Sequence, residues 1–268
     1  MRYVSRRRMA AMNRAAWNEV ASDWEKRGSD IAIEPSFFRD GGSTLYPFEP
    51  GLLGPVRGKR LLHLLCGAGE DSISWARLGA KVTGIDISEK RLEFARIRAR
   101  EARAKVNFVR ADAMRLPFRP GSFDRVFAAR GILCWIPDVF RWMRGIARVM
   151  RPGGKFLLVD DHPLTAIFDM KGNRRLFVSG NYFQRRPEAA GGWWFKIGIK
   201  RPKLKAEVTW RISDVVNAVV RAGFRIERME ELPLTRGKVD VARVYSVRRH
   251  GRIPRDLVLL CRKPSRIG

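Results

Sequence analysis

The sequence predicts a doubly wound α/β fold with a mostly parallel, seven-stranded sheet and helices on both faces. The first observation is an alternation of short apolar runs with helical patterns between residues 60 and 160. The second is a glycine turn, Gly67-Ala68-Gly69, which joins the first apolar run directly to a helical pattern. The third is a composition that is 45% hydrophobic over 268 residues, enough to bury the core of one such domain.

Five strands of the core are expected in this region, joined by right-handed crossovers. The apolar runs lie at residues 60 to 65, 81 to 85, 106 to 110, 123 to 128 and 154 to 160, and the helical patterns at 70 to 78, 88 to 102 and 138 to 150. Gly153-Gly154 is expected to break the chain before the fifth strand. Two further strands, at Phe224 to Leu232 and Leu257 to Leu260, bring the sheet to seven.

The segments that flank this region are expected to cover it. Residues 10 to 27 repeat apolar side chains at helical spacing, which predicts an amphipathic helix ended by Gly28, and the chain from there to Pro55 is expected to be irregular. Residues 161 to 210 break the α/β rhythm, and Ser213 is expected to cap the helix that follows. The predicted organisation is a helical and irregular cap at 1–58, a core at 59–163, a lid-like insertion at 164–211 and the completion of the sheet at 212–268.

The charge is strongly positive, with 54 Lys and Arg residues against 27 Asp and Glu residues and a formal net charge of +27. Such a charge favours anionic ligands, nucleic acid or acidic partners. Basic residues are scattered along the whole chain, however, so a general preference for arginine at the surface is the alternative.

Two further features of the composition bear on the class of protein. No apolar run reaches the length of a membrane span, so no membrane crossing is expected. The three cysteines, Cys66, Cys134 and Cys261, lie far apart without a CxxC pair, which predicts free thiols, no metal site and a cytoplasmic location.

The glycine turn and an aspartate that follows it predict a nucleoside pocket. Glycine lets the backbone turn sharply and lets a ligand approach closer than a β-carbon would permit. Asp86 ends the second predicted strand 17 residues beyond Gly69, where a carboxylate can accept hydrogen bonds from two ribose hydroxyls. The alternative for Asp86 is a helix N-cap, although Ser88 is better placed for capping.

These residues resemble the signature of class I, Rossmann-like S-adenosylmethionine-dependent methyltransferases. LLHLLCGAGEDSISWA at residues 61 to 76 and VTGIDIS at 82 to 88 are similar to the first two motifs of the family. FVRADAMRLPF at 108 to 118, SFDRVFAARGILCWIPD at 122 to 138 and RVMRPGGKFLLVDDHP at 148 to 163 are similar to the next three. The resemblance covers residues 60 to 163. Within the family, the chain most specifically resembles a bacterial group of small-molecule methyltransferases.

The resemblance implies that S-adenosyl-L-methionine is the cofactor and assigns residues to it. Asp112 would contact the adenine amino group and the amide of Ala113 the adenine ring. The full set of implied cofactor-binding residues is His63, Cys66, Gly67, Gly69, Asp86, Ile87, Arg91, Asp112, Ala113 and Arg130.

This chain departs from the family pattern at two positions. His63 stands where the family has Asp or Glu, and Leu65 replaces the first glycine of the turn. An imidazole cannot supply the fixed negative charge of a carboxylate near pH 7. Weaker cofactor binding, or compensation by another acid, is therefore expected.

A dinucleotide-binding Rossmann enzyme is the competing interpretation, because Asp86 would suit NAD equally well. Glu70-Asp71 at the start of the first helix argue against it, since carboxylates there would repel a pyrophosphate. A sulfonium cofactor without phosphates tolerates them.

Methyl transfer requires the nucleophile and the methyl group to be aligned, and a hydroxyl or amine acceptor also has to lose a proton. His162, which follows Asp160-Asp161 after the fifth predicted strand, is the candidate general base. The alternative is a histidine that orients the turn through backbone hydrogen bonds.

Aromatic residues are candidates for binding the acceptor, namely Trp17, Trp24, Trp135, Tyr182 and Trp194. Their alternative role is a small satellite core beneath the insertion. A small-molecule acceptor, aromatic or anionic, is the favoured prediction. An RNA methyltransferase, favoured by the charge, lacks a recognisable RNA-binding module, and a non-catalytic cofactor-binding protein is the third hypothesis.

Overall fold

A computed structural model describes residues 3–26, 33–169, 177–178, 180–190, 203–233 and 253–265. Its core elements, in chain order, are β1 (Arg60–Leu64), α4 (Glu70–Arg77), β2 (Lys81–Asp86), α5 (Glu89–Glu101), β3 (Val106–Arg110), β4 (Phe123–Ala129), the 3-10 helix η1 (Leu133–Trp135), α6 (Val139–Val149), β5 (Met150–Asp161), α8 (Ile212–Arg221), β10 (Arg225–Leu232) and β11 (Asp256–Arg262). The flanking elements are α1 (Arg6–Lys26), α2 (Pro35–Arg39), α3 (Phe48–Leu53), the 3-10 helix η2 (Pro163–Ala166), β6 (Phe168–Asp169), β7 (Phe177–Val178), β8 (Glu188–Ala190) and β9 (Lys205–Glu207).

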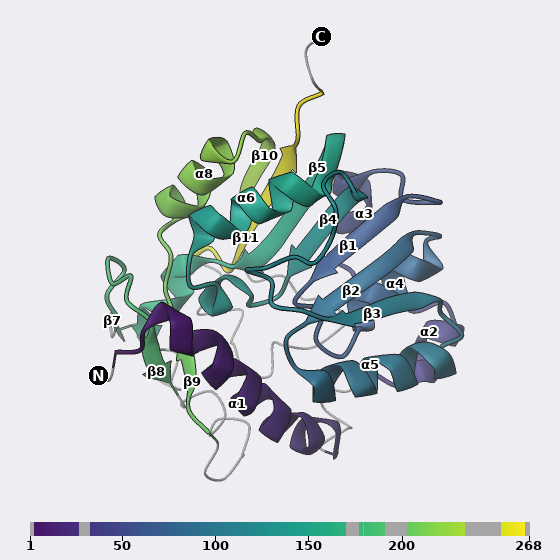
Figure 1. Ribbon diagram of the computed structural model, residues 1–268, viewed down its shortest axis with the longest axis horizontal. Coiled ribbons are helices and arrows are strands. Elements are labelled where there is room, and N and C mark those ends of the chain that lie inside the picture. The colour runs from purple at the N-terminus through teal and green to yellow at the C-terminus, as the bar shows by residue number, and fades with distance from the viewer. Residues whose placement is uncertain are drawn as a thin grey trace.

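The central sheet has seven strands in the order β10-β11-β5-β4-β1-β2-β3. Strands β1 to β5 run parallel to their neighbours, whereas β11 is antiparallel to both β5 and β10. The chain moves outward from β1 in both directions, so the carboxyl ends of β1 and β4 lie side by side where the order reverses (Figure 1). The predicted doubly wound, mostly parallel, seven-stranded sheet is therefore confirmed.

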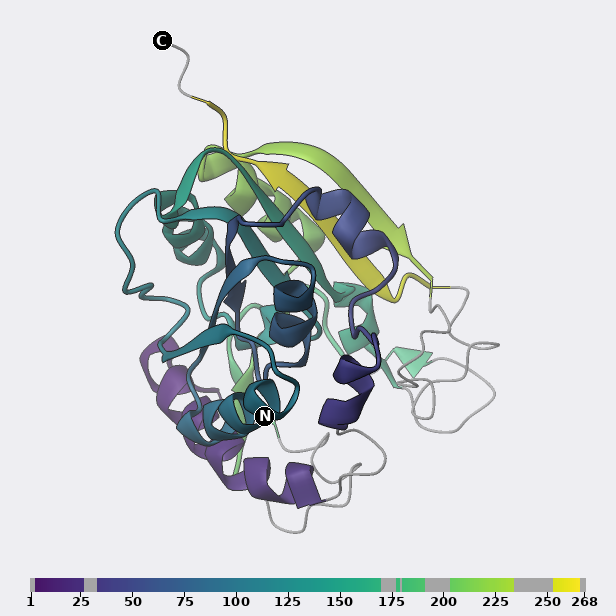
Figure 2. The ribbon, with the colours of Figure 1, turned by 90° about the vertical axis from the view of Figure 1, so that its right-hand side faces the viewer.

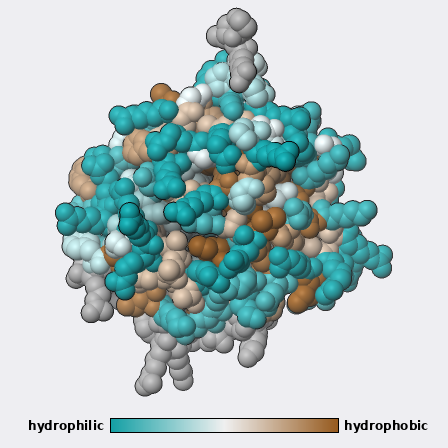
Figure 3. Space-filling view, in the orientation of Figure 1, coloured by the Kyte–Doolittle hydropathy of each residue, from teal (hydrophilic) through white to brown (hydrophobic). Residues whose placement is uncertain are grey.

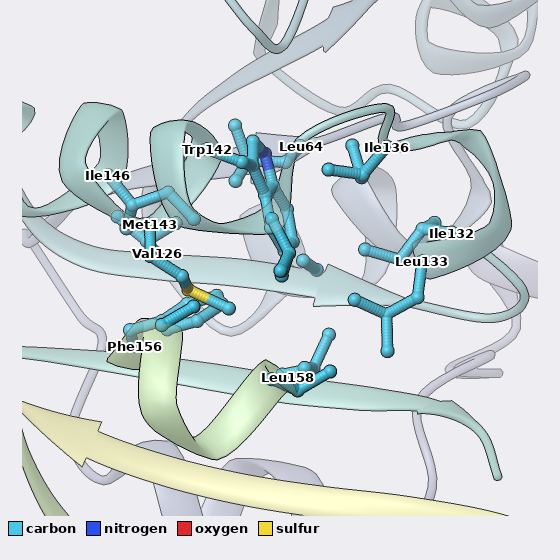
Figure 4. Packing of buried hydrophobic residues seen from close by; sticks show 14 of the residues in the cluster. Leu64, Val126, Ile132, Leu133, Ile136, Trp142, Met143, Ile146, Phe156 and Leu158 are labelled. Carbon is cyan, nitrogen blue, oxygen red and sulfur yellow. The ribbon is translucent and has the colours of Figure 1, made fainter. Parts of the chain in front are cut away.

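Helices cover both faces of the sheet because alternate residues of the strands point to opposite sides. Leu62 and Leu64 of β1 belong to a cluster with Trp142 of α6 and Val215 of α8, and Figure 4 shows 14 members of that cluster. Leu61 of β1 belongs instead to a second cluster on the opposite face, with residues of α3 and α4. Both faces are thus buried, as the unbroken apolar runs of the parallel strands predict.

Helix α1 lies across the carboxyl edge of the sheet, at the lower left of Figure 1. It packs against α5, β9 and η1. Asn13 fixes it to β9 by two reciprocal hydrogen bonds, in which its Nδ2 donates to the carbonyl of Ala206 at 3.0 Å and its Oδ1 accepts from the Ala206 amide at 2.7 Å. The amphipathic N-terminal helix predicted at residues 10 to 27 is confirmed, with an earlier start.

Three local predictions are corrected. The segment from Gly28 to Pro55 is not wholly irregular, because it contains α2 and α3. The chain does not break at Gly153-Gly154, since β5 runs through them with a register shift against β4. Ser213 does not cap α8: the cap position is Arg211, and the hydroxyl of Tyr182 accepts the free amide of Ile212 at 3.1 Å.

Hydrophilic residues cover most of the face seen in Figure 3, with hydrophobic residues showing between them. Within the described part of the chain, no helix is both long enough and apolar enough to cross a membrane.

Candidate functional site

The glycine turn connects β1 to α4 at the carboxyl edge of the sheet, as predicted. Its backbone has positive φ at three positions, 50° at Leu65, 55° at Gly67 and 86° at Gly69. The amide of Cys66 donates to the carbonyl of Ile85 at 2.8 Å, which ties the turn to the end of β2. Leu65 therefore keeps the backbone shape of the glycine that it replaces, in a region that costs an L-residue about 1–2 kcal/mol.

The glycines are required by packing as well as by backbone conformation. A β-carbon on Gly69 would lie 2.8 Å from the ring of Phe108, and one on Gly67 would lie 2.9 Å from Nη2 of Arg91. The guanidinium of Arg91 thus lies against the turn. The thiol of Cys66 is buried on the other side, in the cluster with Phe108, and burial raises its pKa well above the usual value.

Asp86 braces the turn from the end of β2. Its Oδ2 accepts the amide of Gly67 at 3.0 Å, and its Oδ1 accepts the amide of Ser88 at 2.9 Å. Burial raises the pKa of Asp86, and the Ser88 amide, the Arg91 charge and the Gly67 amide act against that rise. A carboxylate has about four lone-pair sites, so two remain for a ligand. Ile87 follows it and is partly buried.

The predicted cap of α5 is confirmed at Ser88, whose hydroxyl accepts the amide of Arg91 at 3.1 Å. Asp86 is therefore not needed as the N-cap. Its position matches the role of a ligand for two hydroxyls better than the alternative.

Asp112 and Ala113 follow β3, the edge strand beside β2. Oδ1 of Asp112 accepts the amide of Met114 at 2.8 Å, which fixes the carboxylate in a local turn. Ala113 is partly buried against the core cluster. Because β2 and β3 are parallel neighbours, Asp86 and Asp112 lie on adjacent strand ends along one edge of the sheet.

His63 is buried beneath the turn, with its ring against Phe127 at a centroid distance of 5.2 Å. Its Nδ1 lies 2.7 Å from the hydroxyl of Ser72 in α4. Burial, together with the positive charge of Arg130, lowers the pKa of His63 to about 3, so its ring is neutral at pH 7. The negative charge that the family has at this position is therefore absent here.

Two other carboxylates gather around Arg130, at the end of β4 beside the turn. The guanidinium of Arg130 lies 3.0 Å from Oε2 of Glu49 and 2.9 Å from Oδ2 of Asp71, and it stacks over Tyr46 at 4.8 Å. The hydroxyl of Thr44 donates a hydrogen bond to Asp71, and the carbonyl of Thr44 accepts one from Nη2 of Arg130 at 3.1 Å. Glu49 is 0% exposed, and burial raises its pKa to about 7 although Arg130 opposes the rise. We call Glu49, Asp71 and Arg130 the arginine cluster.

Sequence reasoning missed Glu49, because its ion-pair partner Arg130 lies 81 positions away in the chain. It singled out Asp71 only for its place at a helix start. A charged residue in the otherwise apolar segment Leu45 to Leu53 was the one available signal for Glu49.

Aromatic side chains close the site from the side of α1. Trp17 lies edge-to-face with Trp135 of η1 at 5.5 Å, and Arg91 lies over the Trp17 ring at 5.5 Å. Asn18 of α1 accepts the hydroxyl of Ser88 at 2.6 Å. The structure thus brings Trp17, Trp135 and Arg91 together above the strand ends that carry the glycine turn and Asp86.

Asp160 positions the loop that carries Trp135. This carboxylate is buried at the end of β5, and its two oxygens accept the amides of Ile132 at 2.8 Å and Leu133 at 2.7 Å. Burial and the neighbouring Asp161 raise the pKa of Asp160 to about 7. The sequence interpretation treated Asp160 only as the lead into His162, and so missed this supporting role.

His162 is fully buried at the start of η2. Its Nδ1 accepts the amide of Leu164 at 3.2 Å, and its Nε2 lies 2.7 Å from Oε1 of Glu231. Burial lowers its pKa, with Glu231 acting in the other direction. In a neutral ring whose Nδ1 accepts, Nε2 carries the proton and donates it to Glu231. The ring then has no free lone pair to take a proton from a methyl acceptor. These contacts fit a histidine that orients the turn.

Described contacts do not bring the other predicted acceptor-binding residues to Trp17, Trp135 and Arg91. Tyr182 contacts the start of α8 through its hydroxyl and Phe183 through its ring. Trp24 lies on α1, but its side chain falls outside the described part, as does Trp194 entirely. Among the described residues, no group of three or more His, Cys, Asp or Glu residues could hold a metal ion.

The fold and this edge define a class of protein. A seven-stranded sheet with an antiparallel final strand, a glycine turn after β1 and acidic residues after β2 and β3 are the features of an S-adenosylmethionine-dependent methyltransferase of class I. The family described as methyltransferase domain matches residues 62–158.

The chain belongs to this methyltransferase family. A methyltransferase of Synechocystis sp., itself uncharacterized, is 36% identical over 185 residues, which are 68% of this chain and 73% of that protein. The crystal structure of an S-adenosylmethionine-dependent methyltransferase from Mesorhizobium loti is 26% identical, with a TM-score of 0.64 over 84% of this chain and 99% of that one.

A relative with a named substrate matches a shorter region. The 27-O-demethylrifamycin SV methyltransferase of Amycolatopsis mediterranei is 45% identical over 113 residues, or 41% of each protein. The chain thus spans less than half of that relative.

Proposed function

We propose that the chain transfers the methyl group of S-adenosylmethionine to a hydroxyl of a small-molecule acceptor. The observation that carries this is the carboxylate of Asp86 at the end of β2, which braces the glycine turn by accepting the amides of Gly67 and Ser88. Its remaining capacity to accept hydrogen bonds is proposed to serve the ligand. The named relative, which acts on a demethylrifamycin, supports a small acceptor. The residues present fit the cofactor, which supplies a methyl group on a positively charged sulfur.

Asp86 is proposed to hold the ribose hydroxyls and Asp112 the adenine amino group. The glycines at Gly67 and Gly69 have no β-carbon to displace Arg91 and Phe108, so the turn keeps the conformation against which the ligand is proposed to lie. Trp17 and Trp135 are proposed to cover the acceptor. This cover would hold the reacting atoms in alignment and exclude water.

The arginine cluster is proposed to replace the missing acid at position 63. The methionyl end of the cofactor carries one ammonium and one carboxylate, and the cluster offers both complementary charges beside the turn. Asp71 would take the ammonium and Arg130 the carboxylate, while Glu49 keeps Arg130 in place.

Calorimetric titration with S-adenosylmethionine and its demethylated product tests the cofactor site. Asp86→Ala is expected to weaken binding more than tenfold, because losing a charged acceptor costs on the order of 1.5–3 kcal/mol. Asp124→Ala is the matched control, since Asp124 also accepts a backbone amide, that of Arg60 at 2.9 Å, but at the opposite edge. Equal effects of the two variants would contradict the assignment.

Methylthioadenosine, which lacks the amino acid end of the cofactor, separates the arginine cluster from Asp86. Arg130→Gln is expected to weaken S-adenosylmethionine about tenfold or more and to leave methylthioadenosine unchanged. Asp86→Ala should weaken both ligands. Parallel loss of both ligands in Arg130→Gln would contradict the role of the cluster.

Turnover with a labelled methyl donor across phenols, aliphatic alcohols and amines tests the acceptor class. Methylation of RNA and of none of the small acceptors would replace the proposal with the RNA methyltransferase. Cofactor binding without any turnover would favour the non-catalytic protein instead.

His162 is proposed as a positioning residue for the turn after β5, in place of the general base expected from sequence. His162→Asn is then expected to lower kcat without removing an ionisation from the acid side of the pH profile of kcat/KM. Loss of that ionisation in the variant would instead support His162 as the general base.

A cytoplasmic location is also proposed, because Cys66, Cys134 and Cys261 are free thiols. Cell fractionation that finds the protein in an oxidising compartment would refute it.

A further inference from the structure

A basic groove lies at the amino edge of β2 and β3, the edge opposite the glycine turn. It has a volume of about 1320 Å³ and lies between the start of these strands and the ends of α4 and α5. Helices α4 and α5 lie on the side of the molecule that faces the viewer in Figure 2. Seven cationic side chains line it, namely Arg60, Arg77, Lys81, Arg96, Arg100, Arg103 and Lys105. No Asp or Glu is among its described lining residues.

Most of these cations are unpaired within the part of the chain that the structure describes. Arg60 lies 3.8 Å from Asp124, and Arg96 donates to the carbonyl of Phe108 at 3.1 Å. The other five make no ion pair or side-chain hydrogen bond with described residues, and all five are exposed. Unlike the arginine cluster, the groove therefore has positive charge that its own carboxylates do not neutralise.

The helix ends at the groove do not account for this charge. Arg77 ends α4, and Arg100 lies in the last turn of α5, where cations offset the negative end of a helix dipole. Each helix end carries only about half a negative charge, so two ends offset about one of the seven cations. In addition, Arg103 has a positive φ of 53°, a conformation that favours glycine.

The groove is separate from the methyl-donor site. Lys81 begins β2 and Asp86 ends it, so the two sites lie about 16 Å apart along this strand. A ligand in the groove therefore does not reach the glycine turn by direct contact.

We propose that this groove binds the phosphodiester backbone of a single-stranded nucleic acid, independently of methyl transfer. A row of unpaired arginines and lysines in a concave surface fits a chain of phosphates. Phe108 and Phe123 are the aromatic residues of the lining and are buried, at 8% and 5% exposure, so bases have no described ring on which to stack. Binding is thus sequence-independent. A flat bilayer fits a concave surface less well than a strand does.

Fluorescence anisotropy with a mixed-sequence, single-stranded 20-nucleotide RNA tests the proposal, with salt as the variable. Five phosphate contacts predict a slope of log affinity against log salt of about −3.5, from about −0.7 per contact. The triple variant Arg77→Gln/Arg100→Gln/Lys105→Gln is expected to make this slope less negative by about 2 units, because three contacts are removed. Its affinity for S-adenosylmethionine should stay unchanged.

The matched control is Arg141→Gln/Arg144→Gln/Arg221→Gln, which removes the same charge from exposed positions on α6 and α8. This variant should bind RNA nearly as the original chain does. Equal losses in the two triple variants would show diffuse attraction by the +27 charge and overturn the groove. Groove-dependent binding to vesicles of anionic phospholipid, without binding to RNA, would refute the proposal that the ligand is a nucleic acid. Loss of the donor affinity alone would bear on the proposed function and leave the groove intact.

Discussion

Leu65 shows how a single residue can carry strain at a binding turn. Its φ of 50° is costly for any residue with a β-carbon and costs glycine almost nothing. We therefore expect Leu65→Gly to be more stable than Leu65→Ala by about 1 kcal/mol, the reverse of the usual order of these residues. Both variants lose the branched end of the leucine side chain from the core and differ only by the β-carbon, so their difference mainly reports the backbone. Urea unfolding of the two variants measures it, and a more stable alanine variant would contradict the strain.

His63 gives the stability of the protein an acid dependence. Its folded pKa of about 3 lies below the unfolded value of about 6.5, so the unfolded state takes up the proton first as the pH falls. The stability that the neutral ring confers is present above pH 6.5 and is lost between pH 6.5 and 3. Between pH 7 and 5 the original chain should lose about 2 kcal/mol more than His63→Asn, which keeps a polar partner for Ser72. Chemical denaturation at both pH values measures this loss, and parallel pH profiles would rule it out.

At the scale of elements, α1 depends on a few polar contacts that hold it over the strand ends. Asn13 is buried and pairs with both backbone groups of Ala206, whereas Arg14 pairs with Glu89 at the surface. Asn13→Ala should therefore increase amide hydrogen exchange in α1 and β9. The substitution leaves two buried backbone groups without hydrogen-bond partners, which costs about 1–3 kcal/mol. Arg14→Ala should change exchange little, since exposed ion pairs contribute about 0–1 kcal/mol. Hydrogen exchange by mass spectrometry reports each segment separately, and equal exchange in the two variants would refute this dependence.

The core elements could be predicted because each carries a local signal. The strands from β1 to β4 and the helices between them lie within about two residues of the expected ranges, since apolar runs and helical spacing are read from neighbours in sequence. The errors fall where a tertiary contact decides. The amide at the start of α8 is satisfied by Tyr182, 30 positions away, instead of by Ser213. Likewise, α2 and α3 are too short to show a helical period.

The site was predictable to the extent that its residues sit in contiguous motifs. Asp86 and Gly67 meet as expected because both follow adjacent parallel strands. The arginine cluster joins three segments through side chains, so no spacing in the sequence announces it. His162 looked available for proton transfer only because Glu231, 69 positions away, could not be foreseen as its partner.

At the scale of the whole molecule, the sheet separates two kinds of electrostatic environment. At the carboxyl edge Arg130 is paired with Glu49 and Asp71. At the amino edge five of the seven cations of the basic groove have no such partners among described residues. These unpaired charges lie away from the cofactor site, which favours binding of a cationic sulfonium in a protein of formal charge +27.

This excess should make folding stability rise with salt. Mutual repulsion among like charges destabilises the compact state, and the Debye length shortens from about 30 Å at 0.01 M to about 10 Å at 0.1 M ionic strength. Screening also weakens the surface ion pairs, but each of these contributes only about 0–1 kcal/mol. With a formal charge of +27, we expect repulsion to dominate and sodium chloride to raise Tm between 10 and 300 mM. A gain of about 1–2 kcal/mol corresponds to roughly 2–8 °C for a chain of this size. Scanning calorimetry measures the shift, with sucrose as a control that leaves charge unscreened. A Tm that falls steadily with salt would mean that the ion pairs contribute more than the repulsion takes away.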